Sequence, residues 1–253
     1  MDLSTVTSFR SARSRDDLAL APGEAWLGGG TWLMSDPQPA TSGLVDLTTL
    51  DWAPWEAVDG GLRIAATCTI EQVVEAPWPE HVRDVVRECA DALLMSFKVQ
   101  QVATVGGNVC LALPAGAMTA LMVALDADVV VWTPDGGERR QSVASFVTGV
   151  RSTTLAPGEV VRAFEVASTA LASRLAFRRL ALHRLGRSSA LVVGRSTDAG
   201  PVVTVTASTP RPYVVSSVSD LAGLDWYADA HGAADWRAAV TRLLVGQVLA
   251  ELA

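Results

Sequence analysis

The feature that most restricts what this sequence can fold into is a run without a charged side chain, from residue 99 to residue 125. A run of this length is long enough to cross a bilayer as one helix. Gln100, Gln101 and Pro114 interrupt it, however, as does the segment Gly-Gly-Asn at residues 106–108. A helix that faces lipid disfavours this mixture, whereas a buried loop followed by a core helix accommodates it. We therefore predict a soluble chain with no membrane contact.

Composition and charge indicate a folded protein that does not bind nucleic acid. Hydrophobic residues make up 49% of the chain and charged residues 19%, a balance that favours folding over disorder. The net charge is −7 and the isoelectric point is about 5.0. A nucleic-acid partner would require a basic surface, which this balance does not predict.

The cysteines and the first residues bear on redox state and location. Cys68, Cys89 and Cys110 show no C-x-x-C spacing. A zinc site, an iron–sulfur site or a disulfide framework needs closer or more numerous thiolates, so we expect reduced cysteines and no metal. Residues 1–15 are polar and charged, which argues against a signal peptide. These features predict a cytoplasmic protein.

Hydrophobic periodicity divides the chain into two parts. In the first part we expect strands at residues 25–27, 43–47, 62–66 and 128–132. A hairpin turn at 134–137 is expected to lead to a returning strand at 141–143. A helix is expected at 79–95, with apolar positions at Val82, Val85, Val86, Cys89, Ala92 and Leu93. In the second part, from near Ser168, we expect strands at 173–182, 190–195 and 202–207, with a turn at 197–201. A helix is expected at 233–252, with an apolar face made of Trp236, Val240, Leu243, Leu244, Val248 and Leu249.

This order of elements predicts an α+β fold. The larger domain is expected at residues 1–168, with a small α/β lobe at about 1–55 and a larger α+β lobe at about 56–168. The smaller domain, at residues 169–253, is expected to be a three-stranded antiparallel sheet with helices.

Two glycine-rich loops are the main candidates for a binding site. One runs from Leu27 through Gly28-Gly29-Gly30 to Thr31, and the other from Ala103 through Thr104 and Gly106-Gly107 to Asn108. Each follows an apolar segment and precedes an expected helix. Consecutive glycines allow several backbone N–H groups to approach one anion, and the threonine hydroxyls can add donors. If both loops face one point, they would hold a pyrophosphate; packing alone can also explain a tight glycine turn.

Several familiar catalytic motifs are missing. Lys98 does not follow a glycine as a Walker loop requires, and Leu33 stands where a dinucleotide-binding fingerprint has its third glycine. The sequence has no G-x-S-x-G, and His81, His183 and His231 have no zinc-binding spacing. We therefore expect no metal ligands and no catalytic acid, base or nucleophile.

With these loops in this order, the sequence resembles the FAD-binding subunits of the xanthine dehydrogenase and carbon monoxide dehydrogenase family of molybdenum hydroxylases. The second loop is identical to the family's Ala-Thr-Val-Gly-Gly-Asn. Further matching segments are Gly28 to Thr31, Val-Asp-Leu at 45–47, Ala-Ala-Thr-Cys-Thr at 65–69, Ala-Leu-Pro-Ala-Gly at 112–116, Ala-Leu-Asp-Ala at 124–127 and Leu-Ala-Pro-Gly-Glu at 155–159. The resemblance covers nearly the whole chain, including a small C-terminal flavoprotein domain.

The resemblance implies non-covalent FAD with its pyrophosphate between the two loops. The residues it assigns to the cofactor are Leu27, Gly28, Gly29, Gly30, Thr31, Trp32, Ala103, Thr104, Gly106, Gly107 and Asn108. By position, Val161 would pack near the flavin ring, and Arg178 would be the basic residue that the last domain often contributes. The redox chemistry would belong to the cofactor.

The resemblance also implies partners: a large subunit with the molybdenum cofactor and a 2Fe–2S subunit, from which electrons pass through the flavin to an external acceptor.

Three departures from the family pattern stand near the expected site: Gln100-Gln101 replaces Arg-Asn, Ala117 replaces Asp, and Trp32 replaces Asp. Two alternatives stay open, a stand-alone FAD-dependent oxidoreductase of similar fold and a scaffold subunit that has lost FAD.

Overall fold

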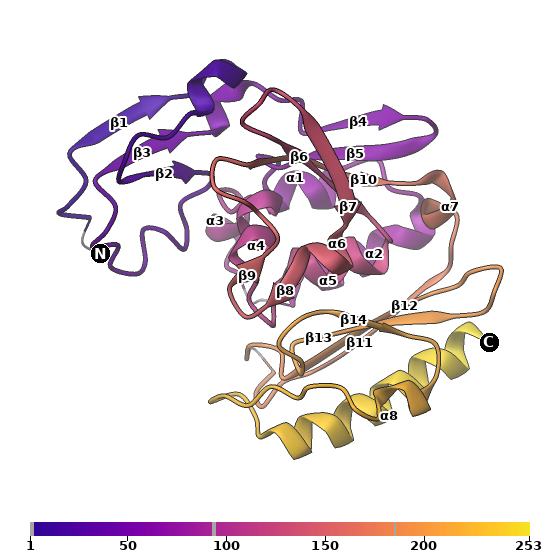
Figure 1. Cartoon of the computed structure of the whole chain (residues 1–253). Helices are drawn as coiled ribbons and strands as arrows, with labels where there is room; N and C mark the ends of the chain where they lie inside the picture. Colours follow the sequence, from indigo (N-terminus) through magenta and orange to yellow (C-terminus); the bar gives the residue numbers. More distant parts are fainter. Residues whose placement is uncertain (1–2, 93–94, 185) are drawn as a thin grey trace.

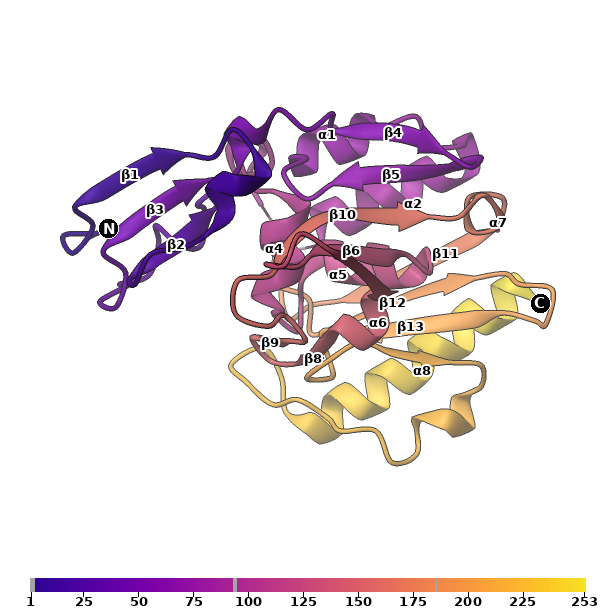
Figure 2. The same ribbon diagram turned by 45° about the horizontal axis from the view of Figure 1, so that its top comes forward.

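The N-terminal lobe is built on a small parallel sheet. The computed structural model describes residues 3–92, 95–184 and 186–253. The sheet has the order β1-β3-β2, with β1 (Ser8–Ser11), β3 (Gly43–Asp46) and β2 (Glu24–Leu27), and the short 3-10 helices η1 (Arg15–Leu18) and η2 (Thr48–Leu50) follow β1 and β3. Val45 on the central strand is fully buried. The sheet thus directs the glycine loop that follows β2 toward the second lobe (Figures 1 and 2).

The second lobe is a five-stranded antiparallel sheet covered by helices. Its order is β4 (Trp55–Val58), β5 (Gly61–Ala65), β10 (Val160–Val166), β6 (Asp128–Trp132) and β7 (Glu138–Ser142). The other elements are α1 (Ile70–Glu75), α2 (Glu80–Asp91), α3 (Phe97–Gln100), α4 (Val105–Leu111), α5 (Ala117–Ala124), α6 (Val143–Phe146), β8 (Val147–Gly149), β9 (Ser152–Thr153) and α7 (Ser168–Leu171). The predicted strands 62–66 and 128–132 and the hairpin between β6 and β7 are confirmed.

The uncharged run forms the interior of this lobe. It comprises the last two residues of α3, then α4 and α5, and every residue of α5 is buried. Among the described residues, no helix has the length and hydrophobicity to span a membrane. The expected helix at 79–95 is α2, which ends at Asp91; its predicted positions Val82, Val85, Val86, Cys89 and Ala92 are buried, and Leu93 lies outside the described residues.

The C-terminal part is a four-stranded antiparallel sheet in the order β11 (Leu175–Leu180), β12 (Ala190–Arg195), β13 (Val202–Thr206) and β14 (Tyr213–Val215), with η3 (Val218–Leu221) and α8 (Ala234–Leu252). The three predicted strands pair as expected, and the short β14 adds a fourth. Leu191 and Val193 on β12 pack into the core of the second lobe, whereas Ala190 and Val192 pack toward α8. The sheet therefore lies between α8 and the larger part of the molecule (Figure 1).

The expected apolar face of α8 is partly wrong. Leu244 and Val248 are buried, but Leu243 is 62% exposed. The buried stripe also includes Val245 and Leu252, which follow the 3.6-residue period of a helix. Leu243 lies outside that stripe.

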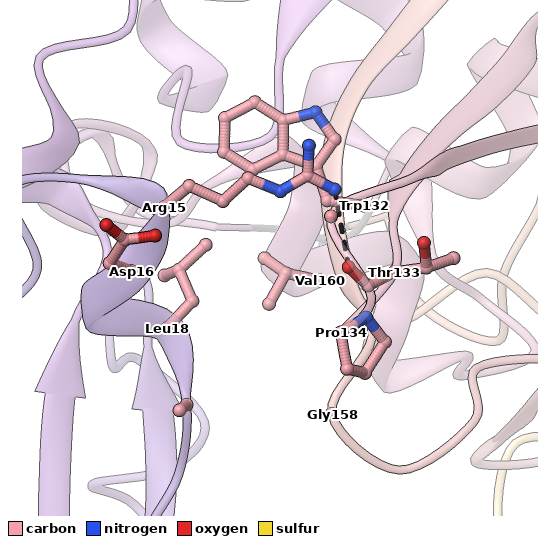
Figure 3. Close-up of a pocket in the computed structure, with 10 residues that line it drawn as sticks. Arg15, Asp16, Leu18, Trp132, Thr133, Pro134, Gly158 and Val160 are labelled. Atoms are coloured by element: carbon pink, nitrogen blue, oxygen red, sulfur yellow. Dashed lines mark hydrogen bonds between the residues drawn. The ribbon is translucent and has the colours of Figure 1, made fainter.

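The first two lobes meet in a seam of tryptophan and arginine side chains. Trp52 and Trp132 pack edge to face, with ring centroids 5.3 Å apart. The Arg15 guanidinium lies 4.7 Å from the centroid of Trp132 and donates to the carbonyl oxygens of Thr133 and Gly137. Figure 3 shows the Arg15 side chain, which extends from η1 across a cavity of about 290 Å³. The seam holds the lobes in one arrangement and thereby sets the distance between their loops.

Candidate functional site

The two glycine-rich loops are in direct contact. A Cβ atom added to Gly29 would lie 1.8 Å from the backbone oxygen of Val102, and one added to Gly28 would lie 2.9 Å from Oγ1 of Thr104. Glycine is therefore required in the first loop for the close approach of the second. The expectation that both loops face one point is met by their contact. The residues after the first loop form turns rather than the expected helix, while the second loop does lead into α4.

The first loop offers free backbone donors. In the described part of the chain, the N–H groups of Gly28, Gly29 and Gly30 donate to no acceptor. Gly30 has a φ of +67°, in the left-handed region where successive N–H groups form a concave site for anions. Three free amides in sequence are costly to bury without an acceptor, and a phosphate oxygen is a suitable one.

The second loop offers side-chain donors instead. Thr104 is the N-cap of α4, and its Oγ1 accepts from the N–H of Gly107 at 3.1 Å; its hydroxyl hydrogen stays available. The Gly106 N–H donates to the Ala66 oxygen at 2.8 Å, and Asn108 Oδ1 accepts from the Met118 N–H at 2.9 Å. The N–H groups of Gly106, Gly107 and Asn108 are thus used within the fold, leaving the Thr104 hydroxyl and the Asn108 amide nitrogen among the side-chain donors.

Two adjoining cavities meet at these loops. The smaller has a volume of about 420 Å³ and the larger about 720 Å³, each within the usual range for ligand sites. The residues that line both are Trp26, Gly28, Thr104, Gly107 and Cys110. The shared residues mark a junction between the two cavities.

Most predicted cofactor residues line these cavities. Gly28, Thr104 and Gly107 line both, Gly106 and Val161 line the smaller, and Leu27, Gly29, Gly30, Thr31, Trp32, Ala103 and Asn108 line the larger. Arg178 lines neither. Its position on β11 directs the guanidinium to Glu251 of α8, with Nη2 and Oε2 2.5 Å apart.

Several lining residues are not predicted from the sequence, and Trp26 and Arg187 are the two of most interest. Trp26, on the strand before the first loop, lines both cavities, and Arg187 from the C-terminal part lines the larger. The indole N–H groups of Trp26 and Trp32 are buried without an acceptor. The strand periodicity gave no reason to separate Trp26 from a core residue, and nothing in the spacing distinguished Arg187 from its neighbouring arginines.

Of the three departures from the family pattern, Trp32 lines the larger cavity, whereas Gln100, Gln101 and Ala117 line neither cavity. Gln100 Nε2 donates to Asp91 Oδ1 at 3.1 Å, and Gln101 Nε2 donates to Glu71 Oε1 at 3.1 Å. Ala117 is fully buried at the start of α5. The N–H of the next residue is capped by Asn108, so the start of α5 does not depend on an acidic residue at position 117.

Two carboxylates in the smaller cavity are neutralised by arginines. Glu24 accepts from Arg10 Nε at 2.9 Å and Nη2 at 2.8 Å, and these bonds lower its pKa to about 2. Glu159 accepts from Arg139 Nε at 2.7 Å and Nη2 at 2.6 Å, which likewise lowers its pKa. Burial raises the pKa of the Cys110 thiol to about 12, so the cysteine is neutral. A bound anion would therefore meet no unpaired negative charge among the described lining residues.

The Glu24–Arg10 pair predicts a specific pH dependence. Because the folded-state pKa of Glu24 lies below its ordinary value of 4.5, ionised Glu24 stabilises the fold above that value, and the contribution is lost as pH falls toward 2. Glu24→Gln is expected to lower the free energy of unfolding in urea at pH 7, and this deficit should shrink toward acid pH. Glu75→Gln, an exposed residue on α1, serves as the control. An equal Glu24→Gln deficit at pH 7 and pH 3 would contradict the pairing.

The site fits FAD on its own geometry. The free amide of Gly28 and the Thr104 hydroxyl lie at the junction, and the free amides of Gly29 and Gly30 line the larger cavity, so that donors for a pyrophosphate stand where the two cavities give room for the rest of FAD. Among residues 3–92, 95–184 and 186–253, no group of three or more His, Cys, Asp or Glu side chains could hold a metal ion.

The fold is shared with solved molybdenum-family enzymes. Quinoline 2-oxidoreductase from Pseudomonas putida 86 matches with a TM-score of 0.83 and 20% identity over 97% of this chain and 96% of that chain. Carbon monoxide dehydrogenase from Hydrogenophaga pseudoflava matches with a TM-score of 0.83 and 19% identity over 98% and 97%. Reconstituted CO dehydrogenase from Oligotropha carboxidovorans gives 0.81 and 19% over 97% and 98%. No curated protein matches the chain.

The sequence itself carries the family assignment. The family described as "FAD binding domain in molybdopterin dehydrogenase" matches residues 13–168, which is more than half of the 253 residues. This match includes both glycine-rich loops and all of the cavity lining except Arg187. The chain therefore belongs to the family of FAD-binding subunits of molybdenum hydroxylases, and its cofactor is FAD.

Proposed function

We propose that this chain is the electron-transfer subunit of a multi-subunit molybdenum hydroxylase, with FAD bound across the junction of the two cavities. The observation that carries this proposal is the set of free N–H groups at Gly28, Gly29 and Gly30, placed against Thr104 within a family that binds FAD. The pyrophosphate lies at these donors. Hydrogen bonds to a charged acceptor contribute more than neutral ones, about 1.5–3 kcal/mol each.

The cofactor extends from the junction into both cavities in this proposal. Val161, in the wall of the cavity of about 420 Å³, is expected to pack near the flavin ring, so that the adenosine half extends toward the cavity of about 720 Å³. Apolar walls keep water from the ring, which strengthens the polar interactions that remain.

Bound FAD supplies the capacity to accept and release electrons. The side chains of this chain bind the cofactor, hold its ends apart and exclude water. None needs to act as an acid or base: Glu24 and Glu159 are ion-paired and Cys110 is a neutral thiol. Electron transfer without a substrate-activating group fits a subunit that relays electrons better than a stand-alone oxidoreductase.

The electrons come from partners in this proposal. Cys68 and Cys89 are buried thiols, whose pKa values burial raises, and the cysteines form no cluster-binding set. The 2Fe–2S centres therefore lie on another chain, next to a large subunit with the molybdenum cofactor, and the complex is cytoplasmic. The FAD domain ends near residue 168, and residues 169–253 form the second domain.

The test is the absorbance spectrum of the purified chain, before and after addition of FAD and desalting. We expect wild type to retain flavin and Gly107→Trp, which fills the junction, to lose it. Gly246→Trp is the control, because position 246 on α8 lines neither cavity and a Cβ there has one neighbour within 4 Å, Val218 Cγ2 at 4.0 Å.

The outcomes separate the alternatives. Wild-type protein that never retains FAD would contradict the proposal and support the scaffold alternative. The stand-alone oxidoreductase would be supported if the chain retains flavin, captures no molybdenum or iron–sulfur subunit from its own source, and reduces its flavin with a small substrate.

A further inference from the structure

The N-terminal lobe is joined to the rest of the molecule by a single chain connection. Its described residues, 3–53, are continuous in sequence, and the connection at Ala53-Pro54 leads directly into β4. In the described part of the chain, its strands β1, β2 and β3 pair only with one another. The lobe shares no sheet with the second lobe, so that it is able to move as a unit about this connection (Figures 1 and 2).

One side chain supplies the hydrogen bonds that hold this lobe against the rest. Arg15 Nη2 donates to the carbonyl oxygen of Thr133 at 3.3 Å and to that of Gly137. Apart from Ser4, no other residue among 3–53 forms a hydrogen bond or an ion pair with the described residues from Pro54 onward. Arg15 is therefore the main directional link between the two lobes.

The other contacts between the lobes are packing contacts. Trp52 packs against Trp132 and against Arg162, whose guanidinium lies 4.3 Å from the Trp52 ring centroid. Because Trp52 stands next to the connection at Ala53-Pro54, these contacts lie at the pivot, where movement of the lobe displaces atoms least. Val160 joins the apolar cluster of the N-terminal lobe, and apolar contacts of this kind have no preferred direction.

Arg15 makes its link across an unfilled space. Figure 3 shows its side chain extending from η1 over the cavity of about 290 Å³, with Leu18 and Val160 on opposite walls and the guanidinium 4.7 Å from the ring centroid of Trp132. Val160 also lines the smaller of the two cofactor cavities, whereas Arg15 lines neither of them. The link is thus adjacent to the cofactor site without being part of it.

Both cofactor cavities have one wall from each lobe. Glu24 and Leu47 of the N-terminal lobe face the smaller cavity together with Val161 of the second lobe. The larger cavity likewise combines Gly29 with Ala103. A cofactor that binds donors of both glycine-rich loops therefore lies between the lobes, and separation of the lobes opens its path to solvent.

We infer that Arg15 is a latch that holds the two lobes together and sets the rates at which FAD enters and leaves the site. This inference rests on the proposed placement of FAD between the glycine-rich loops. The acceptors of Arg15 are backbone oxygens of the protein, so the latch stabilises the closed arrangement equally with and without FAD. A contact that is equal in both states changes no binding equilibrium, but it lowers the open population through which FAD passes in either direction.

The test is stopped-flow fluorescence of the full chain with FAD, which gives the association and release rate constants separately. Charged hydrogen bonds together with a cation–π contact at a partly exposed site favour the closed arrangement by about tenfold. Arg15→Gln should therefore raise both rate constants about tenfold, while the ratio of the two, the dissociation constant, changes by less than about threefold. Arg15→Lys keeps the charge but not the fork of donors, and its rate constants should lie between those of wild type and Arg15→Gln.

Arg13→Gln is the matched control. Arg13 is an exposed arginine of the same segment that lines none of the three cavities, and its backbone N–H, which the substitution keeps, donates to Asp17. Its rate constants should equal those of wild type. Arg15→Lys also keeps the test decisive if glutamine at position 15 lowers the yield of folded protein.

Three results would overturn the inference. If Arg15→Gln has the same two rate constants as Arg13→Gln, Arg15 does not control the opening of the site, and the proposed function still holds. If Arg15→Gln speeds release alone and weakens binding by the same factor, the side chain stabilises the FAD-bound form and is no latch. If the wild-type chain binds no FAD, both the inference and the proposed function are wrong.

Discussion

Alanine at position 29 is expected to destabilise the protein by about 3 kcal/mol and to abolish FAD retention. The added Cβ would lie 1.8 Å from the backbone oxygen of Val102, 2.6 Å from its carbonyl carbon and 3.0 Å from Cα of Ala103. All three are backbone atoms, so no side-chain rotation relieves the overlap, and overpacking of this kind costs about 1–3 kcal/mol or more. The loops must separate, which moves the Gly28–Gly30 amides away from Thr104.

Urea unfolding and flavin absorbance after desalting measure the two effects. Gly246→Ala is the control within a helix: its Cβ has only one neighbour, Val218 Cγ2 at 4.0 Å, and helix propensity predicts a gain of up to about 1 kcal/mol. Gly149→Ala is the control outside a helix, with Ser152 Cβ at 3.8 Å as its neighbour. A Gly29→Ala protein with wild-type stability and flavin content would show that the two loops are not in contact.

Periodicity predicted the elements that bury one consistent face. The positions expected to be buried in α2 are buried because a 12-residue helix shows its stripe clearly. The uncharged run was interpreted correctly as a core loop and helix because Pro114 and the Gly-Gly-Asn segment exclude a membrane span. The second glycine-rich loop is expected to precede a helix, and α4 does follow it, with Thr104 as the N-cap residue.

Local sequence patterns do not predict how the helices and strands are arranged in space. Strand β10 lies between β5 and β6, although many residues separate it from β5 in sequence, and no short-range signal specifies such pairing. The glycines were noted for anion binding, but Gly29 and Gly106 are also required by packing, since a Cβ on Gly106 would lie 2.7 Å from Cβ of Ala66. The packing interpretation is therefore confirmed for Gly29 and Gly106, whereas anion binding by the loops stays a prediction.

The basic residue near the cavities is a second feature that local sequence patterns do not predict. Arg178 was selected by position on a strand, but strand side chains alternate between faces, and the face of Arg178 leads to Glu251 on α8. Arg187 lies in a segment with no regular structure, where spacing predicts no direction. It is found only when the segment is positioned by Ser188 and Arg179. Sites formed by segments distant in sequence depend on contacts of this kind.

The second large effect is expected in the C-terminal domain, where Arg237 of α8 is buried with 1% exposure. Its Nη2 lies 2.5 Å from Oδ1 of Asp229, and its Nη1 donates to the carbonyl oxygens of Ala207 at 3.2 Å and Tyr227 at 3.1 Å. Asp229→Ala would leave a buried guanidinium with neutral acceptors only. Removal of one partner of a buried pair costs about 3–5 kcal/mol, and the 27% exposure of the Asp229 side chain predicts the lower figure.

The reverse substitution should cost less. Arg237→Met keeps most of the buried volume and removes the charge that Asp229 compensates, while Asp229 itself can reach water. We therefore expect Asp229→Ala to be the more destabilising single change and the double variant Asp229→Ala/Arg237→Met to be more stable than Asp229→Ala alone, as measured by urea unfolding. If the double variant is instead less stable than Asp229→Ala, then the carbonyl contacts of Arg237, rather than its charge pairing, hold the segments around Ala207 and Tyr227 to α8. Flavin content at saturating FAD should stay near wild type in each folded variant, because none of these residues lines either cavity.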